Sequence, residues 1–106
     1  MRTIYKYELS PVEGAQLIEM PLGPKFLHVE AIERQLYIWA LVESDWELVL
    51  YPFLVVGTGW ELPKGELIHL GSATMNSGTL VWHVFFAVRG GDRARVGVEK
   101  EESSDE

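Results

Sequence analysis

The segment LIHLGSATMNSGTLVWHVFFAV, from Leu67 to Val88, decides the fold predicted for this 106-residue chain. Residues 67–74 and 79–88 are both apolar runs of strand length, and the second is rich in the aromatic and β-branched side chains that strands favour. The polar stretch at residues 75–78, Met-Asn-Ser-Gly, is typical of a hairpin turn. Two strands joined this closely must run antiparallel. We therefore expect a hairpin here and an antiparallel sheet around it.

The chain before this hairpin repeats the two-residue alternation of β-strands. In Arg2–Leu9, for example, Tyr5 and Tyr7 fall on one face and charged side chains on the other. Turn residues, mainly proline and glycine, separate further apolar runs. A central strand is expected where the run is apolar on both faces. The additional predicted strands are residues 15–20, 26–32, 36–42 (apolar on both faces) and 46–56.

Two positions qualify this interpretation. Pro52 lies inside the run 46–56 and indicates an edge strand or a bulge, because proline cannot donate a hydrogen bond to a neighbouring strand. Between residues 29 and 40 apolar side chains also recur at helical spacing, so a short helix competes with the strand there. The tyrosine, tryptophan and β-branched residues that follow favour the strand.

Seven short strands with turn signals about every ten residues indicate an all-β fold, either a single antiparallel β-sandwich or a small barrel. The length is that of one domain. We assign residues 1–88 to this β domain and residues 89–106 to a charged, flexible tail, since Gly90-Gly91 and a run of charges replace the strand pattern. The chain has no cysteine, which excludes disulfides, thiolate nucleophiles and cysteine zinc sites.

The charge distribution excludes several partners. The net charge is −7, and more than half of it lies from Gly97 onward, where one lysine faces five acidic residues. The remaining body has no basic stripe that could neutralise phosphates, so we expect no nucleic-acid binding. Residues 80–88 form the longest apolar run, which is too short to span a bilayer, and Met1–Leu9 lacks the pattern of a signal peptide. We expect a soluble, cytoplasmic protein with no membrane contact.

Motifs for catalysis, cofactors or metals are weak, so we expect no catalytic residues, no cofactor and no metal site. The three histidines lie on different predicted strands without metal-ligand spacing. Gly57-Thr58-Gly59 is interpreted as a turn rather than a phosphate loop, because no helix follows it. The serines lack a nucleophile motif, and their distance from a histidine cannot be judged from sequence. The histidines are His28, His69 and His83, and the serines considered are Ser44, Ser72 and Ser77.

The surplus of large aromatic residues is the most informative feature of the composition. Twelve occur in 106 residues, four of them tryptophans. A β domain of this size has one well-buried layer, so we expect some aromatic surface to remain for an interface. Trp46 and Trp60 lie beside predicted turns and favour the interface, whereas Trp82 and Phe86 fit the core and the interface equally well. We expect a homo-oligomer formed through this aromatic face.

The segments RTIYKYEL, IEMPLGPKFLHVE, LYIWALVE, VVGTG and LVWHVF together resemble a family of small uncharacterised all-β proteins encoded by bacteriophages and prophages. The resemblance covers most of residues 1–86, and its motif residues are mainly turn formers and core residues. It implies no catalytic residues. Trp60 departs from the pattern, because related sequences tend to have a histidine directly after the GTG turn.

This resemblance implies a non-enzymatic phage or prophage binding protein in the host cytoplasm. Its expected role is to inhibit or divert a host or defence protein by protein–protein contact, with Trp46, Trp60, Trp82 and Phe86 as the candidate contact residues. One alternative is a small-molecule or nucleotide sponge that holds its ligand by aromatic stacking. Another is a minor structural component of the virion.

Overall fold

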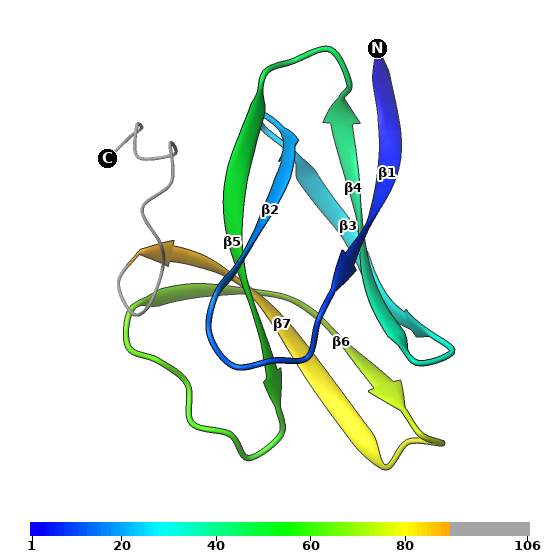
Figure 1. The fold of residues 1–106 in the computed structure, drawn as a ribbon, viewed down its shortest axis with the longest axis vertical. Coiled ribbons are helices and arrows are strands. Elements are labelled where there is room, and N and C mark those ends of the chain that lie inside the picture. Colours follow the sequence, from blue (N-terminus) through cyan, green and yellow to red (C-terminus); the bar gives the residue numbers. More distant parts are fainter. Residues whose placement is uncertain (90–106) are drawn as a thin grey trace.

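Seven strands form two antiparallel sheets that pack face to face as a sandwich in the computed structural model, which describes residues 1–89 (Figure 1). The all-β prediction is confirmed, and the sandwich is selected over the barrel. The predicted tail lies outside the described residues, apart from Arg89 at the end of the last strand. The strands are β1 (Arg2–Leu9), β2 (Gln16–Pro21), β3 (Lys25–Ile32), β4 (Gln35–Glu43), β5 (Leu48–Gly57), β6 (Glu66–Met75) and β7 (Leu80–Arg89).

One sheet has the order β1-β4-β3 and the other the order β2-β5-β7-β6, and every pair is antiparallel. The predicted hairpin is β6–β7, and its turn places Asn76, Ser77 and Gly78 at positive φ. Such a left-handed run is accessible to Asn and Gly at little cost. The central position predicted for residues 36–42 is confirmed, since β4 lies between β1 and β3.

The short helix considered between residues 29 and 40 does not form, because β3 and β4 make a second hairpin there. Glu33, at φ 59°, lies in its turn. Along β4 the burial alternates strictly, with Leu36, Ile38, Ala40 and Val42 facing the interior. Packing of the second sheet against one face of β4 therefore favours the strand, because it buries every second residue, over a helix that would bury residues at helical spacing. Within residues 1–89 no helix is long and apolar enough to cross a membrane.

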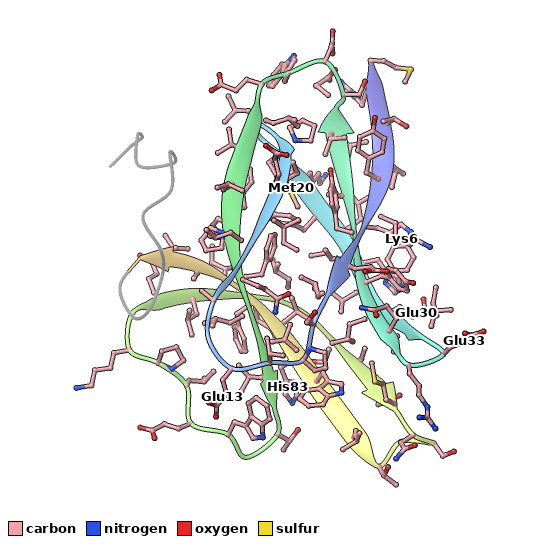
Figure 2. All side chains as sticks on the ribbon, viewed as in Figure 1. Lys6, Glu13, Met20, Glu30, Glu33 and His83 are labelled. Atoms are coloured by element: carbon pink, nitrogen blue, oxygen red, sulfur yellow. The ribbon has the colours of Figure 1, made fainter. Side chains whose placement is uncertain are left out.

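The core lies between the sheets and is centred on Phe53, which is fully buried. Phe26 and Phe86 meet its ring edge-on at centroid distances of 5.4 and 5.9 Å, in the geometry that aromatic pairs prefer. Met20 projects from β2 into the same interior (Figure 2). Phe26, Phe53 and Phe86 thus belong to this inner layer, whereas Phe85 packs in a smaller cluster on the other face of the four-stranded sheet.

Pro52 lies at a local edge, as the sequence indicated, although its strand as a whole is not an edge strand. Its strand, β5, is central, because β2 pairs with one side of it and β7 with the other. Pro52 faces Leu17 of β2, but the pairing with β7 begins only at Phe53, opposite Phe86. The proline thus lies just outside the ladder that would require its missing N–H group.

Candidate functional site

The outward-facing side of β5 is apolar along its whole length. The even-numbered residues of β5 alternate with the core residues Tyr51, Phe53 and Val55, so their side chains lie on the outer face of the four-stranded sheet. An outer face of a sandwich normally carries polar residues at these positions. The first two are exposed and the last three are buried. The outward side chains are Leu48, Leu50, Pro52, Leu54 and Val56.

The exposed half of β5 belongs to a larger apolar surface, which we name the apolar strip. Leu17 pairs with Pro52 across β2 and β5, which places it diagonally next to Leu50. The N–H of Leu22 donates to the carbonyl of Glu47 at 2.8 Å and so holds the β2–β3 turn beside the start of β5. The strip consists of Leu17, Leu22, Trp46, Leu48 and Leu50, with exposed fractions between 39% and 57%.

Trp46 extends the strip at its outer end. It follows the turn after β4, and its ring lies over Gly23, where a Cβ atom would be 3.7 Å from Cζ3 of the indole. The N–H of Gly23 donates to the hydroxyl oxygen of Tyr51 at 3.0 Å, which ties this turn to the core. Burial raises the pKa of Tyr51 above its ordinary value of 10.0, and this hydrogen bond partly opposes that effect. Trp46 therefore stands on an ordered turn, with 52% of its surface exposed.

Acidic side chains border the apolar strip. Glu19 is exposed and lies opposite Leu50, and Glu47 is exposed beside Trp46. Asp45 lies 2.8 Å from the Met1 ammonium, and this hydrogen bond holds the pKa of the Asp45 carboxyl below its usual range while raising the pKa of the amine. Within residues 1–89 the ion pairs involve Asp45 but neither Glu19 nor Glu47, so these two carboxylates make the border of the strip net negative.

At the other end of the β5 outer face, the loop between β5 and β6 and the turn between β1 and β2 line an open groove of about 570 Å³. Leu54 and Val56 form its floor. Trp60, 41% exposed, stands at its edge and packs edge-on against Trp82 at 5.5 Å. Gly57 makes room for this pair, because a Cβ there would lie 3.0 Å from the Trp60 indole nitrogen. The groove is lined by Glu13, Gly14, Leu54, Val55, Val56, Trp60, Glu61, Leu62, Pro63 and Lys64.

The four aromatic candidates from the sequence thus separate into two pairs. Trp46 and Trp60 are exposed, but at opposite ends of β5 rather than on one surface. Phe86 packs against Phe53 and the inner face of the sandwich, and Trp82 also packs on the core. Both side chains are partly buried, so their core contacts are observed while their role in an interface stays a prediction. The Trp82 indole nitrogen is buried and finds no hydrogen-bond acceptor among residues 1–89.

A polar cluster that sequence inspection did not find lies beside the groove, on the outer faces of β6 and β7. The Ser72 hydroxyl is 2.8 Å from Nδ1 of His83 and 3.1 Å from Nε2 of His69. On its other side, His83 Nε2 lies 2.7 Å from the Thr58 hydroxyl. Figure 2 shows His83 close to the lower part of β5. We name Thr58, His69, Ser72 and His83 the histidine cluster.

A bulge in β6 assembles this cluster. The pairing with β7 shifts between His69 and Gly71, so His69 faces Phe85 and Ser72 faces His83 on the same side of the sheet. Without the extra residue, His69 and Ser72 would point to opposite faces. Glycine inside a strand often indicates a bulge, so Gly71 is the sequence feature from which this bulge could have been predicted. It also allows β3 to approach, because a Cβ there would lie 3.0 Å from Cβ of Val29.

The outer face of the three-stranded sheet carries a second aromatic group outside the predicted set. Tyr37 and Trp39 are neighbours on β4, with centroids 5.9 Å apart. The Lys6 ammonium lies 4.4 Å from the Tyr37 ring centre, and His28 packs on Trp39. His28 lies on β3 and is thus in the other sheet from the histidine cluster (Figure 1). In the described part of the chain no three histidine, aspartate or glutamate side chains converge as metal ligands.

Fold and surface together define a small two-sheet β-sandwich domain with an apolar, acid-bordered outer face. Residues 1–94 match the family model described as Domain of unknown function (DUF7352), and the chain belongs to this family. Neither the curated proteins nor the solved structures contain a significant match.

Proposed function

We propose that this protein is a non-enzymatic binding protein that docks on a partner protein through the apolar strip. The supporting observation is that five apolar side chains on neighbouring segments, namely β2, β5 and the turns beside them, stay between 39% and 57% exposed. Single exposed apolar residues are common, but a contiguous group with a polar border is typical of a protein contact site. Trp46 is the anchor of this surface, since tryptophan is enriched among the residues that dominate binding energy.

The charge around the strip specifies the chemistry of the partner. Glu19 and Glu47 lie at its border, so the complementary surface is apolar at its centre and basic at its rim. Burial of a half-exposed leucine contributes about 1 kcal/mol. The strip supplies the centre of an interface of standard size, about 800 Å² on each side, and its polar surroundings supply the rest. The acidic residues from Gly97 onward add long-range attraction to the same kind of partner.

The biological setting rests on the resemblance to phage and prophage proteins. In that setting the partner is a host or defence protein in the cytoplasm of the infected cell, and binding inhibits or diverts it by covering its surface. A basic rim on the partner is compatible with a protein that handles nucleic acid, because such surfaces are rich in lysine and arginine.

Capture from a lysate of host cells, with a matched pair of variants, tests this function. Leu48→Ser and Leu80→Ser remove the same side chain from positions that are 57% and 43% exposed, but Leu80 lies outside the strip. We expect Leu48→Ser to lose the prey and Leu80→Ser to retain it. The captured protein is identified by mass spectrometry, and its activity is then measured with and without the wild-type chain. Identical prey from both variants would rule out the strip as the docking surface.

The sequence predicts a homo-oligomer formed through an aromatic face, and of those aromatic residues only Trp46 belongs to the strip. Self-association through the strip is one form of that prediction. A two-fold pairing of the strip would bring its acidic border, including Glu19 and Glu47, toward the same groups of the second copy. This repulsion favours a different protein as the partner at low salt. Light scattering at 50 and 500 mM salt distinguishes self-association from binding of a basic partner. Salt screens the repulsion between the acidic borders, so the fraction of a dimer held through the strip should increase with salt, whereas a basic partner should dissociate.

The groove beside Trp60 supports a second candidate, a small-molecule binding protein. Its volume of about 570 Å³ falls within the range of ligand pockets, and its floor of Leu54 and Val56 is apolar. A neutral or cationic ring suits it best, because Glu13 and Glu61 outnumber Lys64 among its lining residues. Native mass spectrometry of protein purified from infected cells tests this function, and a discrete added mass that Trp60→Ala abolishes would support it.

A further inference from the structure

We propose that the histidine cluster is a binding site for a divalent transition-metal ion of the zinc type, held by His69 Nε2 and His83 Nδ1. The site is independent of the apolar strip. Its starting point is geometric: the two ring nitrogens lie 3.1 and 2.8 Å from a single point, which the Ser72 hydroxyl oxygen occupies. Two imidazoles aimed at one point form the core of many zinc, nickel and copper sites.

The hydroxyl can give way to an ion. Ser72 is exposed, so rotation about its Cα–Cβ bond moves the hydroxyl into solvent and opens the position between the rings. A Zn–N bond is about 2.1 Å long, so each ring must move inward by about 1 Å. His69 is exposed as well and can follow this movement. With two protein ligands, water completes the coordination, and the ion exchanges readily.

Thr58 prepares His83 for this role. A histidine that binds a metal through one nitrogen donates the N–H of the other nitrogen to an acceptor, and this second bond fixes the ring and its tautomer. The Thr58 hydroxyl lies 2.7 Å from Nε2 of His83, the nitrogen that faces away from the proposed ion. In the metal-bound form Nε2–H donates to Thr58, and Nδ1 offers its lone pair. Thr58 is therefore a positioning residue, while His69 and His83 are the ligands.

The proposal differs from the expectation of no metal site, which rested on the spacing of the histidines along the chain. The β6 bulge brings His69 and Ser72 to one face, and the β6–β7 pairing places His83 opposite Ser72. Nitrogen ligands favour borderline ions over Mg²⁺, which prefers oxygen. The expected selectivity is therefore zinc over magnesium.

Titration of the full-length chain with ZnCl₂, followed by calorimetry, tests the site. We expect one weakly held, exchangeable zinc equivalent per chain and no comparable uptake of MgCl₂. His69→Ala and His83→Ala should each weaken zinc binding at least tenfold. His28→Ala is the matched control, because His28 lies in the other sheet, and it should leave the affinity unchanged. Thr58→Ala should weaken binding about tenfold or more, and Thr58→Ser should restore it.

Two results would overturn the proposal: no zinc uptake by the wild type, or uptake that His69→Ala leaves unchanged. The second result would place the ion elsewhere, for example on carboxylates. If His83→Ala fails to fold, the exposed His69 still decides the question, because its replacement leaves the core intact. Zinc-induced shifts of the imidazole nitrogens, measured by NMR, then show whether Nε2 of His69 and Nδ1 of His83 are the atoms that bind.

Discussion

Replacement of Gly71 by alanine is the substitution whose effect the structure defines most closely. Gly71 lies in β6 next to the bulge, where β3 of the other sheet approaches it. A Cβ at this position would lie 3.0 Å from both Cβ and Cγ2 of Val29, and Val29 is itself buried. The added methyl group therefore forces the two sheets apart at the β3–β6 edge or displaces Val29 from its packing.

Two opposing terms set the size of the effect. Overpacking of a well-packed core costs about 1–3 kcal/mol. Replacing glycine by alanine within a strand stabilises the folded state by about 0.5–1 kcal/mol, because an alanine has less conformational freedom to lose on folding. We expect a net destabilisation of about 1–2 kcal/mol. For a domain of this size each kcal/mol corresponds to a decrease in Tm of roughly 4–8 °C.

Urea denaturation of Gly71→Ala in three backgrounds measures this effect. In the wild type both close contacts exist; in Val29→Ala one of them, to Cγ2, is gone; in Val29→Gly neither remains. The cost of Gly71→Ala should fall stepwise across the series and become neutral or slightly stabilising in Val29→Gly. The same cost in all three backgrounds would refute the close approach of β3 and β6.

Three further predictions concern single side chains. Tyr51→Phe removes the acceptor of the Gly23 N–H and should lower the free energy of unfolding in urea by about 1 kcal/mol. Burial also raises the pKa of Tyr51 in the folded state, so the wild type should lose stability as the pH rises above 10.0, the ordinary pKa of tyrosine. Tyr51→Phe should lose less stability over the same pH range. Gly57→Ala should displace the indole of Trp60, seen as loss of the paired tryptophan signal in near-UV circular dichroism, and an unchanged spectrum would contradict the contact. Asp45→Asn should lower the pKa of the Met1 amine toward 8.0 in an NMR titration, and no change would show that the pair does not form in solution.

The fold was largely predictable because its signals are local. Apolar runs of strand length separated by turn residues identified the strands, and the stretch at residues 75–78 marks the turn between β6 and β7. Trp46 and Trp60 could be expected at the surface because each lies beside a turn. Trp82 and Phe86 could not be assigned from sequence, since β7 is apolar on both faces and the inward face depends on the partner sheet.

The candidate sites depend on sheet order, which sequence does not specify. The apolar strip joins Leu17 to Leu50 only because β2 pairs with β5, although β3 and β4 lie between them in the chain. The histidine cluster needs both the bulge at Gly71 and the β5–β7 pairing that brings Thr58 to His83. Pro52 marks the residue next to which the pairing of β5 with β7 ends, and sequence could not show that the same strand continues into the centre of a sheet.

Fluorine NMR of protein labelled with 5-fluorotryptophan tests the partner surface most directly. The four tryptophans lie in four different environments: Trp46 on the apolar strip, Trp60 at the groove, Trp82 on the core and Trp39 on the opposite sheet. Each resonance is assigned by replacing one tryptophan at a time, and the captured partner protein is then added. Docking through the strip predicts that the Trp46 signal shifts or broadens first and most. A bound complex in which Trp46 is unchanged while Trp60 or Trp39 moves would contradict it.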